Sequence, residues 1–263
     1  MALRALARLL NLAFPEDCRV CGTRLSNFSR VPVCPNCLHA PQPMVAEFAC
    51  TQCHTPFLND APLRPNGLCA LCRSGIAMYQ AVYSYGFYEG ALRKLVHLFK
   101  YQRISTLAEP LGQLLVAALP RGERFDLIVP LPLHWWRRYR RGFNQAALLA
   151  KPVSRATGWP VEQLLRRVKN TGAQAGLTRS ARRRNVAGAF RVTDAERLRG
   201  KRVLLIDDVF TTGATAAAAT AALRRAGAAR VAVLTLARVD RRQPALALQT
   251  NAVAQLAASG VGA

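Results

Sequence analysis

The chain has 263 residues, 51% of them hydrophobic, and its 37 Lys+Arg outnumber its 14 Asp+Glu to give a formal net charge of +23. This length suggests one medium domain plus a smaller unit, and the apolar content argues against a largely disordered chain. The basic surplus favours acidic partners, namely nucleic acid, phosphorylated metabolites or anionic membrane. The surplus is uneven, since residues 121–200 hold 18 Lys+Arg against 5 Asp+Glu, whereas residues 1–80 hold 7 against 4.

Residues 1–14 alternate leucines with two arginines and predict a short amphipathic helix. Arginine inside the apolar stretch, with no small-x-small cleavage site, argues against a signal peptide. No run in the chain approaches the roughly 18 apolar residues that a membrane span needs. We therefore expect a cytoplasmic protein without a membrane span.

Residues 15–78 contain all eight cysteines, in four Cys-x-x-Cys pairs: Cys18/Cys21, Cys34/Cys37, Cys50/Cys53 and Cys69/Cys72. Each pair can present two thiolates to one tetrahedral ion, so two pairs complete a structural zinc site. Four disulfides are the alternative, but four identical spacings are unusual for a disulfide framework, and nothing else indicates export. We predict two structural Zn²⁺ in a double zinc ribbon. Consecutive pairing and cross-braced pairing both fit the spacing.

Residues 79–240 predict an α/β domain. We expect strands at 81–87, 125–130, 161–168, 187–192, 203–206 and 230–237, and helices at 89–100, 107–119, 144–156 and 216–223. On the first of these helices Arg93, Lys94 and Lys100 are assigned to the polar face, opposite the apolar one. Parallel crossovers make a doubly wound, mainly parallel sheet the expected fold. We expect residues 241–263 to form a disordered tail.

An unusual segment follows the expected strand at 125–130. It combines aromatic and cationic residues: Trp135, Trp136, Arg137, Arg138, Tyr139, Arg140 and Arg141. A solvated charge run is the simpler explanation, but charge runs seldom contain so many aromatic residues. Cations neutralise phosphates and aromatic faces stack on unpaired bases, so the six residues from Trp135 to Arg140 predict single-stranded DNA binding.

The stretch around which the domain is organised begins with the expected strand at 203–206. Two acids, Asp207 and Asp208, end it, and a turn leads into an Ala-rich helix through Thr211, Thr212, Gly213, Ala214 and Thr215. Backbone N–H groups of such a turn and of the helix N-terminus form an anion site, and Gly213 is expected to let the backbone approach a ligand without a Cβ in the way. Adjacent carboxylates repel each other unless a cation or hydroxyl groups compensate, which argues against a purely structural strand end. A phosphate in the turn with two hydroxyls on the acids describes a ribose 5-phosphate.

The sequence from Asp207 to Thr215 resembles the phosphoribosyl pyrophosphate (PRPP) motif of type I phosphoribosyltransferases. This resemblance implies that Asp207 and Asp208 contact the ribose 2- and 3-hydroxyls while residues 211–215 wrap the 5-phosphate. Further motifs accompany it, namely the cysteine pairs, Arg-Gly-Phe-Asn-Gln at 141–145, Gln174-x-x-Leu177, Arg183-x-Asn185-Val186 and Ala189-Phe190. Together they make residues 15–238 similar to the ComF family, which joins a double zinc ribbon to a phosphoribosyltransferase-like domain.

The family resemblance implies a role in handling incoming single-stranded DNA during natural transformation, with other competence proteins as partners. Trp135-Trp136 and the C-terminal tail are departures from the family pattern. As an enzyme, the protein would use PRPP with Mg²⁺, with Asp207 and Asp208 stabilising an oxocarbenium-like transition state and Arg141 donating to the departing pyrophosphate. No base-recognition hood can be identified unless the zinc region supplies it, so we favour the nucleic-acid role over a transferase acting on a nitrogen base.

Overall fold

The computed structural model describes residues 16–25, 30–133, 139, 142–169, 188–240 and 242. The helix expected at 1–14 and the expected tail, apart from residue 242, lie outside these ranges. In the described ranges, no helix combines the length and the hydropathy that crossing a bilayer requires.

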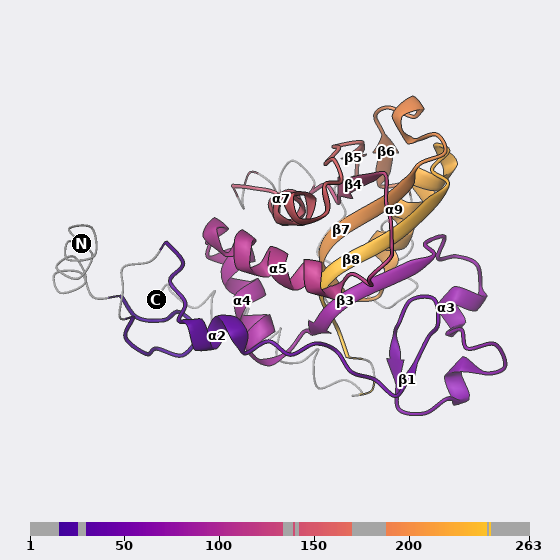
Figure 1. Ribbon diagram of the computed structural model, residues 1–263. Helices are drawn as coiled ribbons and strands as arrows, with labels where there is room; N and C mark the ends of the chain where they lie inside the picture. Colours follow the sequence, from indigo (N-terminus) through magenta and orange to yellow (C-terminus); the bar gives the residue numbers. More distant parts are fainter. Residues whose placement is uncertain are drawn as a thin grey trace, which may run out of the picture.

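A parallel four-stranded sheet forms the centre of the molecule (Figure 1). Its strand order is β3 (Ala81–Phe87), β8 (Arg230–Arg238), β7 (Arg202–Phe210) and β4 (Leu127–Pro130). The two central strands are apolar and buried; Val203, Leu204, Leu205 and Ile206 have no exposed surface. Continuous apolar strands of this kind occur where both faces of a sheet are covered.

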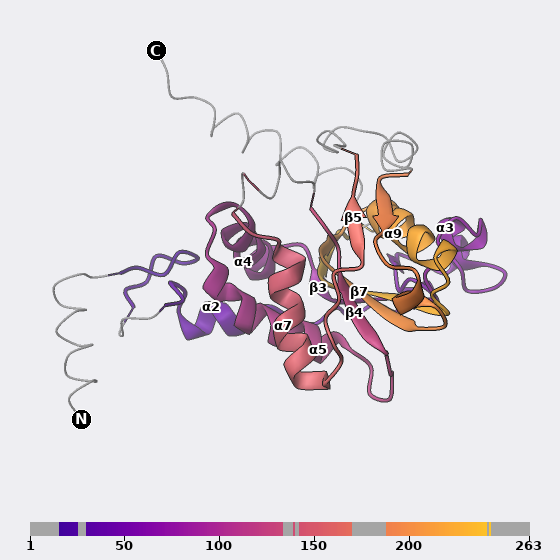
Figure 2. The same cartoon turned by 90° about the horizontal axis from the view of Figure 1, so that it is seen from above.

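Helices cover both faces of the sheet (Figure 2). On one face lie α4 (Gly90–Tyr101), α5 (Ala108–Ala118) and α7 (Gln145–Thr157), and on the other lies α9 (Ala214–Arg225). Three short 3₁₀ helices span Ala61–Leu63, Ser105–Leu107 and Glu196–Leu198. The predicted doubly wound, mainly parallel fold is confirmed.

Two expected strands lie outside the central sheet. They are shorter than expected, β5 (Leu165–Arg167) and β6 (Phe190–Val192), and they pair antiparallel with each other. The chain before β5 meets the sheet only briefly, where Ile128 of β4 donates to the Pro160 carbonyl and accepts from the Glu162 N–H, both at 2.8 Å. Apolar alternation indicated the strands but not their partner.

The cysteine-containing region lies on two sides of the molecule (Figures 1 and 2). α2 (Pro35–His39) lies beside α4, whereas β1 (Phe48–Ala49), β2 (Pro56–Phe57) and α3 (Ala70–Arg73) lie on the opposite side. β1 and β2 form an antiparallel pair.

Between the two parts, residues 41–44 form a strap on β3. The Met44 N–H donates to the Tyr85 carbonyl at 2.7 Å, and the Tyr85 hydroxyl donates to the Pro41 carbonyl at 3.0 Å. A Cβ on Gly86 would lie 2.6 Å from the Gln42 carbonyl oxygen, so only glycine admits the strap this closely.

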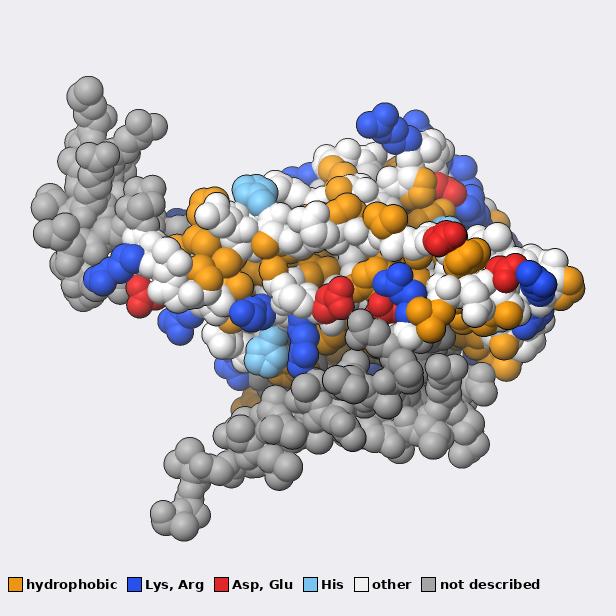
Figure 3. All heavy atoms as spheres, turned by 90° about the horizontal axis from the view of Figure 1, so that it is seen from below, with side chains coloured by type: hydrophobic (Ala, Val, Ile, Leu, Met, Phe, Trp, Pro, Cys, Tyr) orange, Lys and Arg blue, Asp and Glu red, His pale blue; other side chains and the backbone are white. Residues whose placement is uncertain are grey.

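Basic side chains are dispersed over the surface in Figure 3, where Lys and Arg occur in several separate groups among apolar and polar side chains. Several described arginines also pair with acids: Arg155 with Glu109, Arg197 with Glu162, Arg202 with Asp126 and Arg230 with Glu123. The described part of this face therefore shows no single concentrated basic patch.

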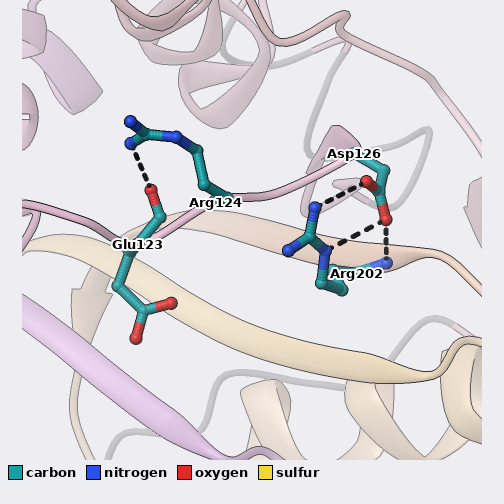
Figure 4. Close-up of polar contacts among 4 residues, drawn as sticks. All are labelled: Glu123, Arg124, Asp126 and Arg202. Carbon is teal, nitrogen blue, oxygen red and sulfur yellow. Dashed lines mark hydrogen bonds and ion pairs between the residues drawn. The ribbon is translucent and has the colours of Figure 1, made fainter.

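One of these pairs fixes β4 beside β7 at their amino-terminal ends (Figure 4). The Asp126 carboxylate accepts from the Arg202 backbone N–H at 2.7 Å and from its Nη2 at 3.0 Å, while the Arg124 guanidinium donates to the Glu123 carbonyl. Hydrogen bonds from Arg202 hold the pKa of Asp126 below its ordinary value. These polar groups are satisfied within the fold, at the end of the sheet opposite the two acids that follow Ile206.

Candidate functional site

The two acids and the turn lie at the carboxyl end of β7, next to β8 and β4. The strand runs further than the sequence indicated and includes Asp207 and Asp208. Thr211, exposed, and Thr212, half-buried, follow Phe210, and α9 begins at Ala214. Ligands of open α/β sheets bind at this end of the strands.

The first turn of α9 has the features of an anion site. Its N-cap is Gly213, which supplies no side-chain cap, and the Ala214 N–H makes only a long 3.4 Å hydrogen bond to Thr212 Oγ1. The first N–H groups of a helix lack intrahelical acceptors, and the helix dipole favours negative charge there. A phosphate can accept from these groups.

Gly213 is required for a different reason from the one expected. Its φ is +76°, and an added Cβ would lie 2.6 Å from Phe210 Cζ and 3.2 Å from Tyr79 Oη. The missing side chain therefore faces the interior of the protein rather than a ligand. The expectation that Gly213 makes room for the ligand is replaced by a left-handed turn packed tightly on Phe210.

Asp207 is bonded to its neighbour and has a raised pKa. The Asp208 N–H donates to Asp207 Oδ1 at 2.8 Å. Burial, together with the neighbouring Asp208 charge, raises the pKa of Asp207 to about 7. Asp207 therefore exchanges its proton near neutral pH, which suits a group that hydrogen-bonds to hydroxyls.

A lysine that the sequence analysis did not associate with this site completes the cluster. The Lys100 ammonium lies 2.7 Å from Asp208 Oδ1, and both side chains are only 13% exposed. Burial lowers the pKa of Lys100, but Asp208 and then Asp207 outweigh burial and raise it above its ordinary value. The assignment of Lys100 to the polar face of its helix was wrong.

Helical spacing contained a signal for Lys100. The residue lies four positions after Val96, so it borders the apolar face, and its long side chain reaches from the last turn of α4 to the end of β7. Nearby, burial raises the pKa of Tyr88, and Phe143 packs against Phe99 with ring centroids 5.5 Å apart.

The motif at 141–145 has a structural function in its described part. Asn144 caps α7, accepting from the Ala146 N–H at 3.1 Å while its own amide donates to the Leu131 carbonyl at 3.1 Å. This ties the start of α7 to the carboxyl end of β4, beside β7.

Most of the predicted DNA-binding segment lies outside the described residues: Trp135, Trp136, Arg137, Arg138 and Arg140, as does Arg141. Tyr139 is described and is 78% exposed. The described residues on its two sides lie close together, since Leu131 follows β4 and its carbonyl accepts from the Asn144 amide just after Gly142. Its roles in DNA and pyrophosphate binding remain predictions.

The eight cysteines form two groups of four in consecutive order, Cys18, Cys21, Cys34 and Cys37, and Cys50, Cys53, Cys69 and Cys72, with the Sγ atoms of each group within 4.8 Å of one another. In both groups the N–H of the third cysteine donates to the Sγ of the first at 3.3 Å. Four converging sulfurs fit one tetrahedral Zn²⁺, and the pairing left open by the sequence is consecutive.

Comparisons with known proteins agree with this architecture. The phosphoribosyl transferase domain family matches residues 144–255. The DNA utilization protein YhgH of Salmonella typhimurium is 34% identical over 235 residues, which cover 86% of this chain and 99% of that protein. Competence protein F of Haemophilus influenzae is 33% identical over 65% of this chain and 78% of its own length.

Among solved structures, a glutamine PRPP amidotransferase from B. subtilis aligns with 52% of this chain and 30% of its own, at 21% identity and a TM-score of 0.38. The fold assignment rests instead on the strand order and the family match. The class is thus a phosphoribosyltransferase-like domain preceded by two Cys₄ groups arranged as in a double zinc ribbon. Within that class, the chain belongs to the ComF family.

Proposed function

We propose that this protein handles single-stranded DNA during DNA uptake and holds a ribose 5-phosphate, as in PRPP, at the end of β7. The observation that carries the proposal is the joint placement of Asp207, Asp208 and an uncapped helix N-terminus in a chain whose relatives are named for DNA utilization and competence.

Ribose-phosphate binding follows from the chemistry of the two halves of the site. The turn at 211–215 offers backbone N–H groups and threonine hydroxyls to a phosphate, and the carboxylates of Asp207 and Asp208 accept hydrogen bonds from sugar hydroxyls. Carboxylate oxygens are also Mg²⁺ ligands, but Asp208 already pairs with Lys100. We therefore place the expected Mg²⁺ with the pyrophosphate of PRPP.

Single-stranded DNA binding is assigned to the segment at 135–140. Tyr139 is 78% exposed, aromatic side chains of this kind stack on unpaired bases, and the neighbouring arginines supply charge. The dispersed basic groups in Figure 3 and the small surplus of residues 1–80 provide no stronger competing site on the face shown.

Two structural Zn²⁺ complete the proposal. Four thiolates at each site need a metal to be stable in a reducing compartment, so we propose a cytoplasmic protein with about two zinc per chain by elemental analysis. A metal-free preparation that contains no free thiols would indicate disulfides instead.

The DNA assignment is tested by fluorescence anisotropy with labelled single strands. Arg137→Ala with Arg138→Ala should weaken binding and flatten its salt dependence, whereas Trp135→Ala should weaken binding at an unchanged salt slope. Duplex DNA of the same sequence is the control and should bind more weakly. Unchanged binding by all these variants would place the site elsewhere.

The ribose-phosphate assignment is tested by calorimetry with PRPP. Asp208→Ala should lose the hydroxyl contacts, and the absence of heat from the wild-type protein at millimolar PRPP would refute the assignment.

The match of residues 144–255 to the transferase domain favours catalysis as a second candidate function. Pyrophosphate release from PRPP and Mg²⁺ in a mixture of bases, lost in Arg141→Ala, would establish it.

A further inference from the structure

A single ammonium group is inserted at the two carboxylates of the candidate site. Lys100 Nζ lies 2.7 Å from Asp208 Oδ1, and Asp208 is in turn bonded through its N–H to Asp207. With all three groups ionised the cluster has one net negative charge, and protonation of Asp207 makes it neutral. The cluster is thus nearly compensated by the chain's own residues.

The position of Lys100 is fixed by the packing of its helix. Leu95, Val96 and Phe99 on the preceding turns of α4 are at most 1% exposed. Phe99 also contacts Phe143, in the segment that leads into α7. Since the helix cannot rotate without exposing these side chains, the ammonium is held at the end of β7 by the core of the domain.

A divalent cation and this ammonium compete for the same carboxylate. Mg²⁺ and Mn²⁺ bind carboxylate oxygens at short range. The buried Lys100 ammonium repels these cations and already pairs with Asp208 Oδ1. A buried ion pair is costly to break when one partner is left uncompensated. A resident divalent ion therefore does not fit the two acids while Lys100 is in place.

We propose that Lys100 takes the position of a divalent cation at Asp207 and Asp208, so that a ribose 5-phosphate binds here without a metal ion. This inference rests on the proposed ribose-phosphate function. Asp208 keeps one carboxylate oxygen for a sugar hydroxyl, and Asp207 supplies a second acceptor. The lysine supplies positive charge beside the adjacent acids when the negatively charged phosphate binds.

Mn²⁺ binding, followed by electron paramagnetic resonance, tests the competition directly. The wild-type protein should show no Mn²⁺ site at these acids, and Lys100→Met should gain one that disappears again when Asp208→Asn is added. Lys94→Met is the matched control, because Lys94 is exposed on the same helix and its substitution removes the same charge. Absence of a gained site in a folded Lys100→Met protein would overturn the proposal.

Calorimetry with ribose 5-phosphate supplies the second measurement. The wild-type protein should bind equally well in EDTA and in Mg²⁺, and Lys100→Met should bind about tenfold more weakly in EDTA and recover with Mg²⁺. Lys100→Arg keeps the charge and should remain independent of the metal, which covers the case in which the methionine variant does not fold.

The outcomes separate the two proposals. Wild-type binding that is lost in EDTA overturns the role of Lys100 and leaves the ribose-phosphate function standing. If no variant binds ribose 5-phosphate or PRPP, the proposed ribose-phosphate function fails. In that case the Mn²⁺ measurement alone still decides whether Lys100 holds the cation position.

Discussion

The two Cys₄ groups have the same local turn in different surroundings. In each, the N–H of the first cysteine donates to the carbonyl of the residue five positions later. The N–H of the residue after the second cysteine donates to the carbonyl of the first cysteine, from Gly22 to Cys18 and from His54 to Cys50, both at 2.8 Å. That residue has positive φ, +75° at Gly22 and +52° at His54. An added Cβ at Gly22 meets nothing within 4 Å, whereas the ring of His54 hydrogen-bonds to the sheet.

His54 and two further side chains join the second group to the sheet. The His54 Nδ1–H donates to the Val82 carbonyl at 2.9 Å, and its ring stacks on Tyr83. Arg238, 1% exposed at the end of β8, donates to the Cys53 carbonyl at 2.8 Å. Gln52 donates to the Tyr79 carbonyl at 2.6 Å.

The first group is more peripheral. Cys21 is exposed, and a polar contact with α4 is a 3.3 Å hydrogen bond from the exposed Lys94 to the Val20 carbonyl. All four cysteines of the second group are buried. The same cysteine turn can thus be an attachment or a part of the core, depending on what its neighbours contact.

The second group also supports the candidate phosphate turn. The Arg238 guanidinium lies 4.9 Å from the centroid of the Phe210 ring, and Tyr79 packs edge-on against the same ring. Phe210 is the residue on which Gly213 is packed. A continuous set of contacts therefore joins the Cys53 carbonyl to the start of α9.

Removing each proposed zinc site in turn should give the largest difference in thermal stability. Structural zinc contributes about 10 kcal/mol or more in small zinc domains, so Cys50→Ser with Cys53→Ser should lower the midpoint of thermal unfolding by more than about 10 °C. Cys18→Ser with Cys21→Ser should shift it by less than about 3 °C. Circular dichroism and zinc analysis check this, and equal shifts would mean that both groups belong to the core.

Arg238→Met should have the next largest effect. The variant leaves the buried Cys53 carbonyl without its charged donor, at a cost of about 2–4 kcal/mol in the free energy of unfolding, measured by denaturant titration. It should also weaken ribose 5-phosphate binding because Phe210 loses its support. Arg242→Met is the control, since Arg242 lies over Phe87 and pairs with Asp240 away from the cysteines. Equal losses in the two variants would contradict the coupling.

Substitutions at the two positive-φ residues, His54 and Gly22, separate the contribution of the His54 ring from that of the backbone. His54→Ala keeps the strained backbone and loses the contacts with β3, at about 2 kcal/mol, whereas His54→Gly relieves the strain and should lose less. Gly22→Ala should cost about 1 kcal/mol through its backbone alone. A His54→Ala protein as stable as the wild type in chemical unfolding would show that the ring contributes nothing, and one more stable than His54→Gly would show that the positive φ carries no strain.

The smallest effect is expected for Lys94→Ala. An exposed hydrogen bond of this kind contributes less than about 0.5 kcal/mol to the free energy of unfolding. A loss above 1 kcal/mol in the same titration, roughly the value of a full buried hydrogen bond, would show that the first group is held more firmly than its exposure indicates.

The sequence predicted the elements whose signals are local. Buried strands such as β7 appear as apolar runs, and the acids after Ile206 marked the candidate site because chain order alone places them at a strand end. Interactions between distant segments were not predictable in this way. Cysteine spacing is the same for consecutive and cross-braced pairs, and the reach of Lys100 toward Asp208 depends on how α4 packs.

Two further features were hidden for the same reason. A buried Arg238 has no periodic signal, since its partner Cys53 lies far away in the chain. The need for glycine at position 213 was recognised, but its cause, the Phe210 ring, becomes visible only when the turn is folded back on the strand.

The strap at 41–44 has a consequence for how the protein behaves in solution. It bonds to β3 at Tyr85, at the border of the sheet where no further strand of the described residues pairs, and Pro160 and Glu162 bond to Ile128 of β4 at the other border. An incoming strand from a second molecule would have to displace one of these segments before it could pair. Both borders of the described sheet are therefore partly covered, which works against edge-to-edge aggregation.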